Sequence, residues 1–203
     1  MHREILTAEQ EKLLPLVKKF SSEFGLVGGT AVALHLGHRR SIDFDLFTAA
    51  HFNIPAIQSK ITRSGSVQKV LVKRKGEFTL LIDSVKFTFF EYPFPTPFSE
   101  QFENIIRIPD LLTLGAMKAY ALGRRAKWKD YVDLYFIAKK YDGLERIAEQ
   151  GRKIFGGEFN EKIFRVQLAY FEDIDYGESV EFMEGCAVPD AVIREGLIRF
   201  CIS

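Results

Sequence analysis

Residues 26–47 read LVGGTAVALHLGHRRSIDFDLF. A short apolar run ends at paired glycines, residues 30–36 have the composition of a helix, and residues 41–47 alternate as a strand does. Glycines between a strand and a helix let the backbone approach a phosphate, and the helix N-terminus offers it free N–H groups and a favourable dipole. The segment therefore predicts a phosphate-binding turn at Gly28 and Gly29, with the Thr30 hydroxyl as a further phosphate ligand.

Asp43 and Asp45 lie two positions apart on the predicted strand, so both side chains should point to the same face. Two carboxylates this close repel each other unless a cation lies between them. Mg²⁺ (or Mn²⁺) prefers oxygen ligands and is usually held by one or two carboxylates together with substrate phosphates. The pair is a candidate metal site. A solvated polar face is the alternative, and the preceding glycine turn favours the metal site.

The composition excludes several classes of protein. Lys and Arg number 28 against 27 Asp and Glu, so net charge gives no indication of a nucleic-acid partner. No apolar run reaches the length of a membrane span and the first ten residues lack a signal-peptide core, which predicts a cytoplasmic protein with no membrane partner. Cys186 and Cys201 are too few for a disulfide framework and are expected to be reduced core residues.

Along the chain, the pattern changes from mixed α/β to helical. Three prolines at positions 93, 95 and 97 interrupt the β pattern and mark the best candidate linker. We therefore expect an α/β (α+β) domain over residues 1–97, with a mixed sheet flanked by helices, and a helical half over residues 98–203. Helices are predicted at residues 8–24, 54–63, 110–123, 128–141, 144–155, 161–170 and 190–201, and strands at 78–82 and 85–90 with turns at 75–77 and 83–84.

Residues 111–140 read LLTLGAMKAYALGRRAKWKDYVDLYFIAKK. Lys118 lies in an otherwise apolar stretch, and Asp130 and Asp133 lie in a helix that is apolar nearly all round and should be buried. Buried charges need partners. The partners are either those of a functional site or structural cations, for which the nearby candidates are Arg124, Arg125 and Lys129.

Taken together, the two quoted segments resemble the AbiEii/AbiGii toxin family of the DNA polymerase β-like nucleotidyltransferase superfamily. The resemblance implies a nucleotidyltransferase-type sheet whose active site the helical half completes. It also implies one role for each matching residue: Gly28, Gly29 and Thr30 hold a nucleoside triphosphate, Asp43 and Asp45 bind the metal ions, Lys118 touches phosphate, and Asp130, with Asp133 as a weaker candidate, lies in the site.

The resemblance further implies Mg²⁺-dependent transfer of a nucleoside monophosphate from the triphosphate to an acceptor hydroxyl. RNA, above all tRNA, is the favoured acceptor and a protein hydroxyl is the second. Such an enzyme would be the toxin of a toxin–antitoxin or phage-defence pair, with a cognate antitoxin as a partner.

One feature departs from the superfamily pattern, which often has a third carboxylate on a neighbouring strand. The expected position is near Thr88, which is not acidic. Glu91 is a reserve candidate, although it shares the strand parity of Val85 and is expected on the other face. Two alternatives therefore stay open: a catalytically impaired nucleotide- or RNA-binding module with the same fold, or a partner-binding protein in which the motif is structural.

Several residues near the motifs allow both a functional and a structural interpretation. Arg39 and Arg40 either contact phosphate or lie in a solvated loop, and His35 and His38 are expected to be surface or packing residues. The phenylalanines of the β region are expected in the core. A set of basic side chains forms either an RNA-binding rim or solvated surface: Lys69, Lys73, Arg74, Lys75, Arg124, Arg125, Lys127 and Lys129.

Overall fold

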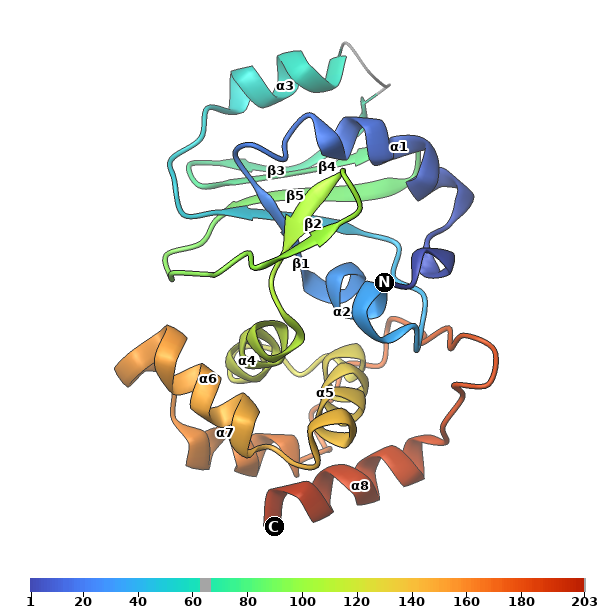
Figure 1. Cartoon of the computed structure of the whole chain (residues 1–203), viewed down its shortest axis with the longest axis vertical. Helices are drawn as coiled ribbons and strands as arrows, with labels where there is room; N and C mark the ends of the chain where they lie inside the picture. Colours follow the sequence, from blue (N-terminus) through green and yellow to red (C-terminus); the bar gives the residue numbers. More distant parts are fainter. Residues whose placement is uncertain (63–66, 203) are drawn as a thin grey trace. The chain divides into compact units, whose positions relative to one another are not determined.

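The computed structural model describes residues 1–62 and 67–202 (Figure 1). They divide into two compact units: the first holds Met1–His35 and Arg40–Asp110, and the second holds Leu36–Arg39 and the chain from Leu111 onward. The unit changes at Asp110 rather than at the predicted residue 97, so the proline-rich segment lies inside the first unit. The chain passes between the units three times, and the sequence neighbours Arg39 and Arg40 belong to different units.

The first unit contains a mixed five-stranded sheet, which confirms the predicted fold class. Strands β2 (Phe44–Thr48) and β5 (Val85–Glu91) are parallel, and all other neighbouring strands are antiparallel. The predicted hairpin turn is confirmed at Asp83 and Ser84, whose φ angles of 47° and 67° are those of a tight hairpin. The strands in spatial order are β1 (Gly25–Val27), β2 (Phe44–Thr48), β5 (Val85–Glu91), β4 (Glu77–Ile82) and β3 (Val67–Arg74).

One face of this sheet forms the aromatic core of the first unit. Phe87 and Phe89 of β5 are fully buried, and the rings of Phe20 and Phe24 lie 4.8 and 5.4 Å from that of Phe89. Helices α1 (Ala8–Lys18) and α3 (Ile54–Thr62) lie on the same side of the sheet (Figure 1). The expectation that the phenylalanines form core is therefore confirmed for these positions.

The helix predicted over residues 8–24 is shorter than expected, and the helix predicted over residues 54–63 is described as far as Thr62. The helix predicted over residues 8–24 ends at Lys18. The Ser21 hydroxyl donates a hydrogen bond to the Lys18 carbonyl there, and the chain continues in turns. The helix predicted over 54–63 ends at Thr62 in the described part, and its last residue, 63, lies outside the described residues.

A short hairpin and a helical second unit complete the chain. The antiparallel strands β6 (Glu100–Phe102) and β7 (Ile106–Ile108) were not predicted, because three residues are too few to give a strand period. The second unit confirms the five predicted helices to within two residues at each end. They are α4 (Leu111–Leu122), α5 (Trp128–Tyr141), α6 (Glu145–Phe155), α7 (Glu161–Leu168) and α8 (Asp190–Ile202).

Short 3₁₀ turns occur at Arg3–Ile5 and Gly156–Glu158. Across residues 1–62 and 67–202, the helices are all too short or too polar to span a bilayer.

Candidate active site

The glycine turn brings a carboxylate against the backbone at the start of a helix. Helix α2 (Gly28–Leu36) begins directly after β1, and Gly28 has a φ of 72° that other residues rarely adopt. A Cβ built on Gly28 would lie 2.1 Å from Oδ2 of Asp45, which is closer than any real contact. Asp45 therefore occupies the space that a side chain at position 28 would fill.

Asp43 and Asp45 are positioned by different means. Asp45 lies within β2, as the register partner of Val27 in β1. Asp43 precedes β2, so the predicted strand over residues 41–47 starts later than expected and strand alternation applies to Asp45 alone. The Asp43 backbone carbonyl accepts the Thr30 hydroxyl, and its carboxylate Oδ2 lies 2.6 Å from Nζ of Lys86.

The segment before β2 lacks strand pairing because side chains satisfy its carbonyls. The Thr30 hydroxyl contacts the Ser41 carbonyl at 3.3 Å as well as that of Asp43, and Gln10 Nε2 donates to the Ser41 carbonyl at 2.8 Å. The Thr30 side chain is buried. Its contacts in the structure tie α2 to the strand that carries Asp45, and a contact with phosphate stays a prediction.

The two neighbouring arginines lie in different surroundings. Arg40 Nη1 donates to the carbonyls of Ile5 and Leu6 at 3.4 and 3.3 Å. A phosphate role for Arg40 remains a prediction. Arg39 is 1% exposed, so the solvated-loop interpretation of Arg39 is wrong. His38, which is equally buried, is a packing residue.

On β5 a lysine and a threonine lie beside the two aspartates. Thr88 is the register partner of Asp45, and Lys86 contacts Asp43. Glu91 pairs with Thr48, on the face of Phe87 and Phe89, and its carboxylate lies 2.8 Å from the His51 ring. Within the described ranges, no three His, Cys, Asp or Glu side chains are grouped so that they could hold a metal ion. The carboxylates on this face that could hold an ion are Asp43 and Asp45.

The second unit holds a buried charge cluster built on α4 and α5. Lys118 Nζ lies 2.5 Å from Asp130 Oδ1 and 2.7 Å from Asp133 Oδ2. Arg125 Nε donates to Asp130 at 2.9 Å. Arg39 Nε and Nη2 donate to the two oxygens of Asp133 at 2.7 and 2.8 Å. The cluster thus joins three of the sequence candidates within one unit.

The charges in this cluster stabilise one another against the cost of burial. Burial alone would raise the pKa of Asp133, but the charges of Arg39 and Lys118 hold it well below its usual value. Burial also opposes the charge on Lys118, yet the two aspartates leave its pKa raised. His38 Nε2 lies 2.9 Å from Asp133, and burial lowers the pKa of this histidine.

The sequence identified some of these partners and missed others. Arg125 was predicted for the aspartates and does contact Asp130, whereas Arg124 pairs with Glu158 and Lys129 with Glu178. The partners Arg39 and His38 were missed because they lie more than 90 positions away from Asp133 in the chain. The only signal for them is the general need of buried aspartates for positive partners, which does not specify residues far away in the chain.

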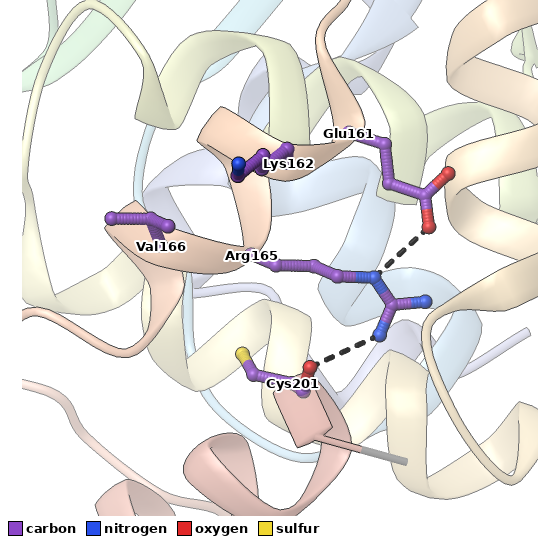
Figure 2. Close-up of a pocket in the computed structure, with 5 residues that line it drawn as sticks. All are labelled: Glu161, Lys162, Arg165, Val166 and Cys201. Carbon is purple, nitrogen blue, oxygen red and sulfur yellow. Dashed lines mark hydrogen bonds and ion pairs between the residues drawn. The ribbon is translucent and has the colours of Figure 1, made fainter.

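A separate pocket of about 520 Å³ lies in the second unit, and none of the predicted site residues is among those that line it (Figure 2). Glu161, Lys162, Arg165, Val166 and Cys201 line it. The Arg165 guanidinium donates to the Glu161 carboxylate and to the Cys201 carbonyl. Burial raises the pKa of the Cys201 thiol to about 11, so the thiol stays protonated. Both cysteines are free but partly exposed, so the prediction that they are core residues is wrong.

A family model described as "Nucleotidyl transferase AbiEii toxin, Type IV TA system" matches residues 16–181. This range includes the glycine turn with its aspartates and the Lys118–Asp133 segment. The chain belongs to the AbiEii family. As an AbiEii protein it is a nucleotidyltransferase, and the family's role is that of a toxin in type IV toxin–antitoxin systems. The resemblance seen in the sequence is thereby confirmed.

Other proteins share sequence or fold with this AbiEii chain. An uncharacterized protein of Aquifex aeolicus (strain VF5) is 33% identical over 175 residues, which cover 83% of this chain and 84% of that protein. JHP933 from Helicobacter pylori has a TM-score of 0.62 at 18% identity, over 96% of this chain and 89% of its own. The nucleotidyltransferase toxin MenT4 from Mycobacterium tuberculosis H37Rv has a TM-score of 0.59 at 15% identity, over 96% and 84%. At these identities the two structures show a common fold.

Proposed function

We propose that this AbiEii protein transfers a nucleoside monophosphate from a nucleoside triphosphate to an acceptor hydroxyl, with Mg²⁺ (or Mn²⁺) as its cofactor. The observation that carries the proposal is the close approach of the Asp45 carboxylate to Gly28 at the N-terminus of α2. A phosphate-binding helix terminus and a hard-oxygen ligand thus share one place in the fold.

The residues present fit a divalent ion. Asp43 and Asp45 supply carboxylate oxygens, which Mg²⁺ prefers, and the missing side chain at Gly28 leaves the space in which the Asp45 carboxylate lies. When bound, such an ion neutralises phosphate charge and activates the attacking oxygen.

The roles of the chain's own groups follow from their positions. The N–H groups at the start of α2 have no partners within the helix and would bind phosphate oxygens of the triphosphate. Thr30 holds the Asp43 backbone in place. The acceptor hydroxyl loses its proton to solvent water, and its oxygen forms a bond to the α-phosphorus while the bond to the leaving pyrophosphate breaks. Lys118 and Asp130 are proposed to be required for this turnover.

RNA is the proposed acceptor, with tRNA first and a protein hydroxyl second. The support is the exposed basic edge of the sheet, where Lys69, Lys73 and Arg74 of β3 and Lys75 of the following turn are all exposed. Such a row attracts a phosphate backbone without reading its sequence. The family's role also suggests a cognate antitoxin that suppresses the activity.

A label-transfer assay tests the proposal. The purified chain is incubated with Mg²⁺, total tRNA or total protein, and each α-labelled triphosphate in turn. We expect label on tRNA, and a loss on the order of 1,000-fold in Asp43→Asn and Asp45→Asn. Asp83→Asn, a carboxylate removed from the hairpin turn, serves as the matched control and should transfer normally. Undiminished transfer by the Asp45→Asn variant would contradict the proposal.

A second candidate function is nucleotide binding without turnover. It is favoured by Thr88, which places a hydroxyl where a carboxylate beside Asp45 could serve as a base. Calorimetry with Mg²⁺ and each triphosphate separates the two candidates. Binding without any labelled product on tRNA or protein would favour the binding module, and absence of both would favour a partner-binding protein.

A further inference from the structure

A lysine lies on the same face of the sheet as the candidate metal ligands. The parallel register pairs Phe44 with Phe87 and Asp45 with Thr88. Asp43 precedes Phe44 and Lys86 precedes Phe87, and the Asp43 carboxylate lies 2.6 Å from Nζ of Lys86. Because side chains alternate along β5, Lys86 shares its face with Thr88 and not with the buried Phe87. Lys86 therefore lies on the same face of the sheet as Asp43 and Asp45.

This lysine changes the charge of the candidate site. Asp43 and Asp45 contribute two negative charges, and Lys86 cancels one of them. Within the described ranges there is no cluster with a third acidic or imidazole ligand. A divalent ion that binds Asp43 has to compete with the ammonium of Lys86 for this carboxylate.

We infer that Lys86 is an active-site cation that neutralises Asp43 before substrate binds and then contacts the phosphates. The inference rests on the proposed function, which supplies the triphosphate and the ion. A lysine suits the second role, because its ammonium is a compact charge on a flexible stem that can move from a carboxylate to a nearby phosphate.

The exposure of the pair allows this exchange. The side chains of Lys86 and Asp43 are 36% and 30% exposed, so their ion pair is screened by solvent. An incoming ion can therefore displace the ammonium from Asp43 at small cost. Once displaced, Lys86 remains on the face of β5 next to the start of β2, where the nucleotide phosphates are expected.

The two roles predict effects of opposite sign when the charge is removed. In Lys86→Gln, the ion no longer competes with an ammonium for Asp43. Binding of Mn²⁺ to the protein alone should tighten by about two- to five-fold, the range expected for loss of a partly exposed ion pair. Binding of a non-hydrolysable triphosphate analogue with Mn²⁺ should instead weaken, and kcat/KM for transfer should fall on the order of 100-fold.

The experiment is a Mn²⁺ titration of the full chain followed by electron paramagnetic resonance, first without nucleotide and then with the analogue. Lys86→Arg keeps the charge and should bind Mn²⁺ as the wild type does. Lys12→Gln removes an exposed lysine from α1 as the matched control. Thermal unfolding of each variant verifies its fold, and Lys86→Met provides a second neutral variant.

Tighter Mn²⁺ binding in both neutral variants, together with weaker analogue binding, supports the inference. Unchanged or weaker Mn²⁺ binding in the neutral variants, or analogue binding that does not weaken, overturns it. Because Mn²⁺ binding needs no turnover, failure of wild-type label transfer would defeat the proposed function without altering this readout.

Discussion

Arg39 and Asp133 form a buried two-point ion pair, with Nε and Nη2 of the arginine 2.7 and 2.8 Å from the two carboxylate oxygens. Their side chains are 2% and 0% exposed. The pair joins the four-residue segment Leu36–Arg39 to helix α5 within the second unit. Residues 36–39 lie between the glycine turn and the acidic pair in the sequence, yet Asp133 of the helical unit holds them in place.

Removing one partner of this pair should strongly destabilise the protein. Asp133→Asn removes the carboxylate that the buried Arg39 contacts, which typically costs about 3–5 kcal/mol in the free energy of unfolding. Arg39→Met should cost less, because Lys118 still lies 2.7 Å from Asp133. Urea denaturation measures the loss. Arg3→Gln breaks two exposed ion pairs, with Glu11 and with Glu103, and should leave the midpoint nearly unchanged. Equal midpoint shifts for buried and exposed pairs would show that the cluster does not stabilise the fold.

Stability should also fall with acid because of His38. Burial lowers the pKa of this histidine, so the folded state stays neutral while the unfolded chain gains a proton near pH 6.5. The unfolded state then binds more protons, and the free energy of unfolding decreases as pH falls through that value. We expect the urea midpoint to fall between about pH 8 and about pH 5, and to fall less in His38→Gln. Parallel pH profiles for the two proteins would rule out this contribution.

The close approach at Gly28 gives a test with an internal control. Gly28→Ala places a Cβ 2.1 Å from Asp45 Oδ2, whereas Gly76→Ala meets the Glu91 Cβ at an ordinary 3.5 Å. Both glycines have similar positive φ angles of 72° and 76°, so the backbone strain of about 1–3 kcal/mol is common to both variants. Only Gly28→Ala should lose Mn²⁺ binding and label transfer. Equal losses in both would indicate that general destabilisation is responsible.

A carboxylate introduced at position 88 of β5 should strengthen ion binding. Thr88→Asp places an acidic side chain directly beside Asp45 in the parallel register. The added repulsion should lower thermal stability, and Mn²⁺ binding without nucleotide should tighten on the order of tenfold because ligand charge sets affinity. Thr88→Asn has the same shape without the charge and should do neither. If both variants bind Mn²⁺ as the wild type does, position 88 does not face the ion.

The parts of the site that lie close together in sequence could be predicted from it. The glycine turn, the helix after it and the acidic pair fall within residues 26–47, and each follows from a local rule of backbone or periodicity. The β3–β4–β5 meander was likewise marked by its turns at Gly76 and Asp83. The helices of the second unit follow from apolar spacing alone, and all five appear within two residues of their expected ends.

The remaining features depend on tertiary contacts. The strand containing Asp45 starts at Phe44, because the side chains of Thr30 and Gln10 donate hydrogen bonds to the carbonyls before it. The periodicity of the sequence does not encode these contacts. The choice between a solvated and a buried Arg39 required knowledge of Asp133, 94 positions away. Lys86 was not singled out in the sequence, because its significance depends on the parallel pairing of β2 with β5.

Because the chain passes between its units three times, no single cut separates it into these two units. A fragment ending at Asp110 would retain Leu36–Arg39 but lose α5, leaving an arginine and a histidine exposed without the aspartate that they share. The complementary fragment would contain Asp133 with Lys118 but without Arg39. Protease sites or split-protein junctions engineered near residue 110 should therefore yield fragments that fold poorly on their own. Cleavage at that position should inactivate the toxin.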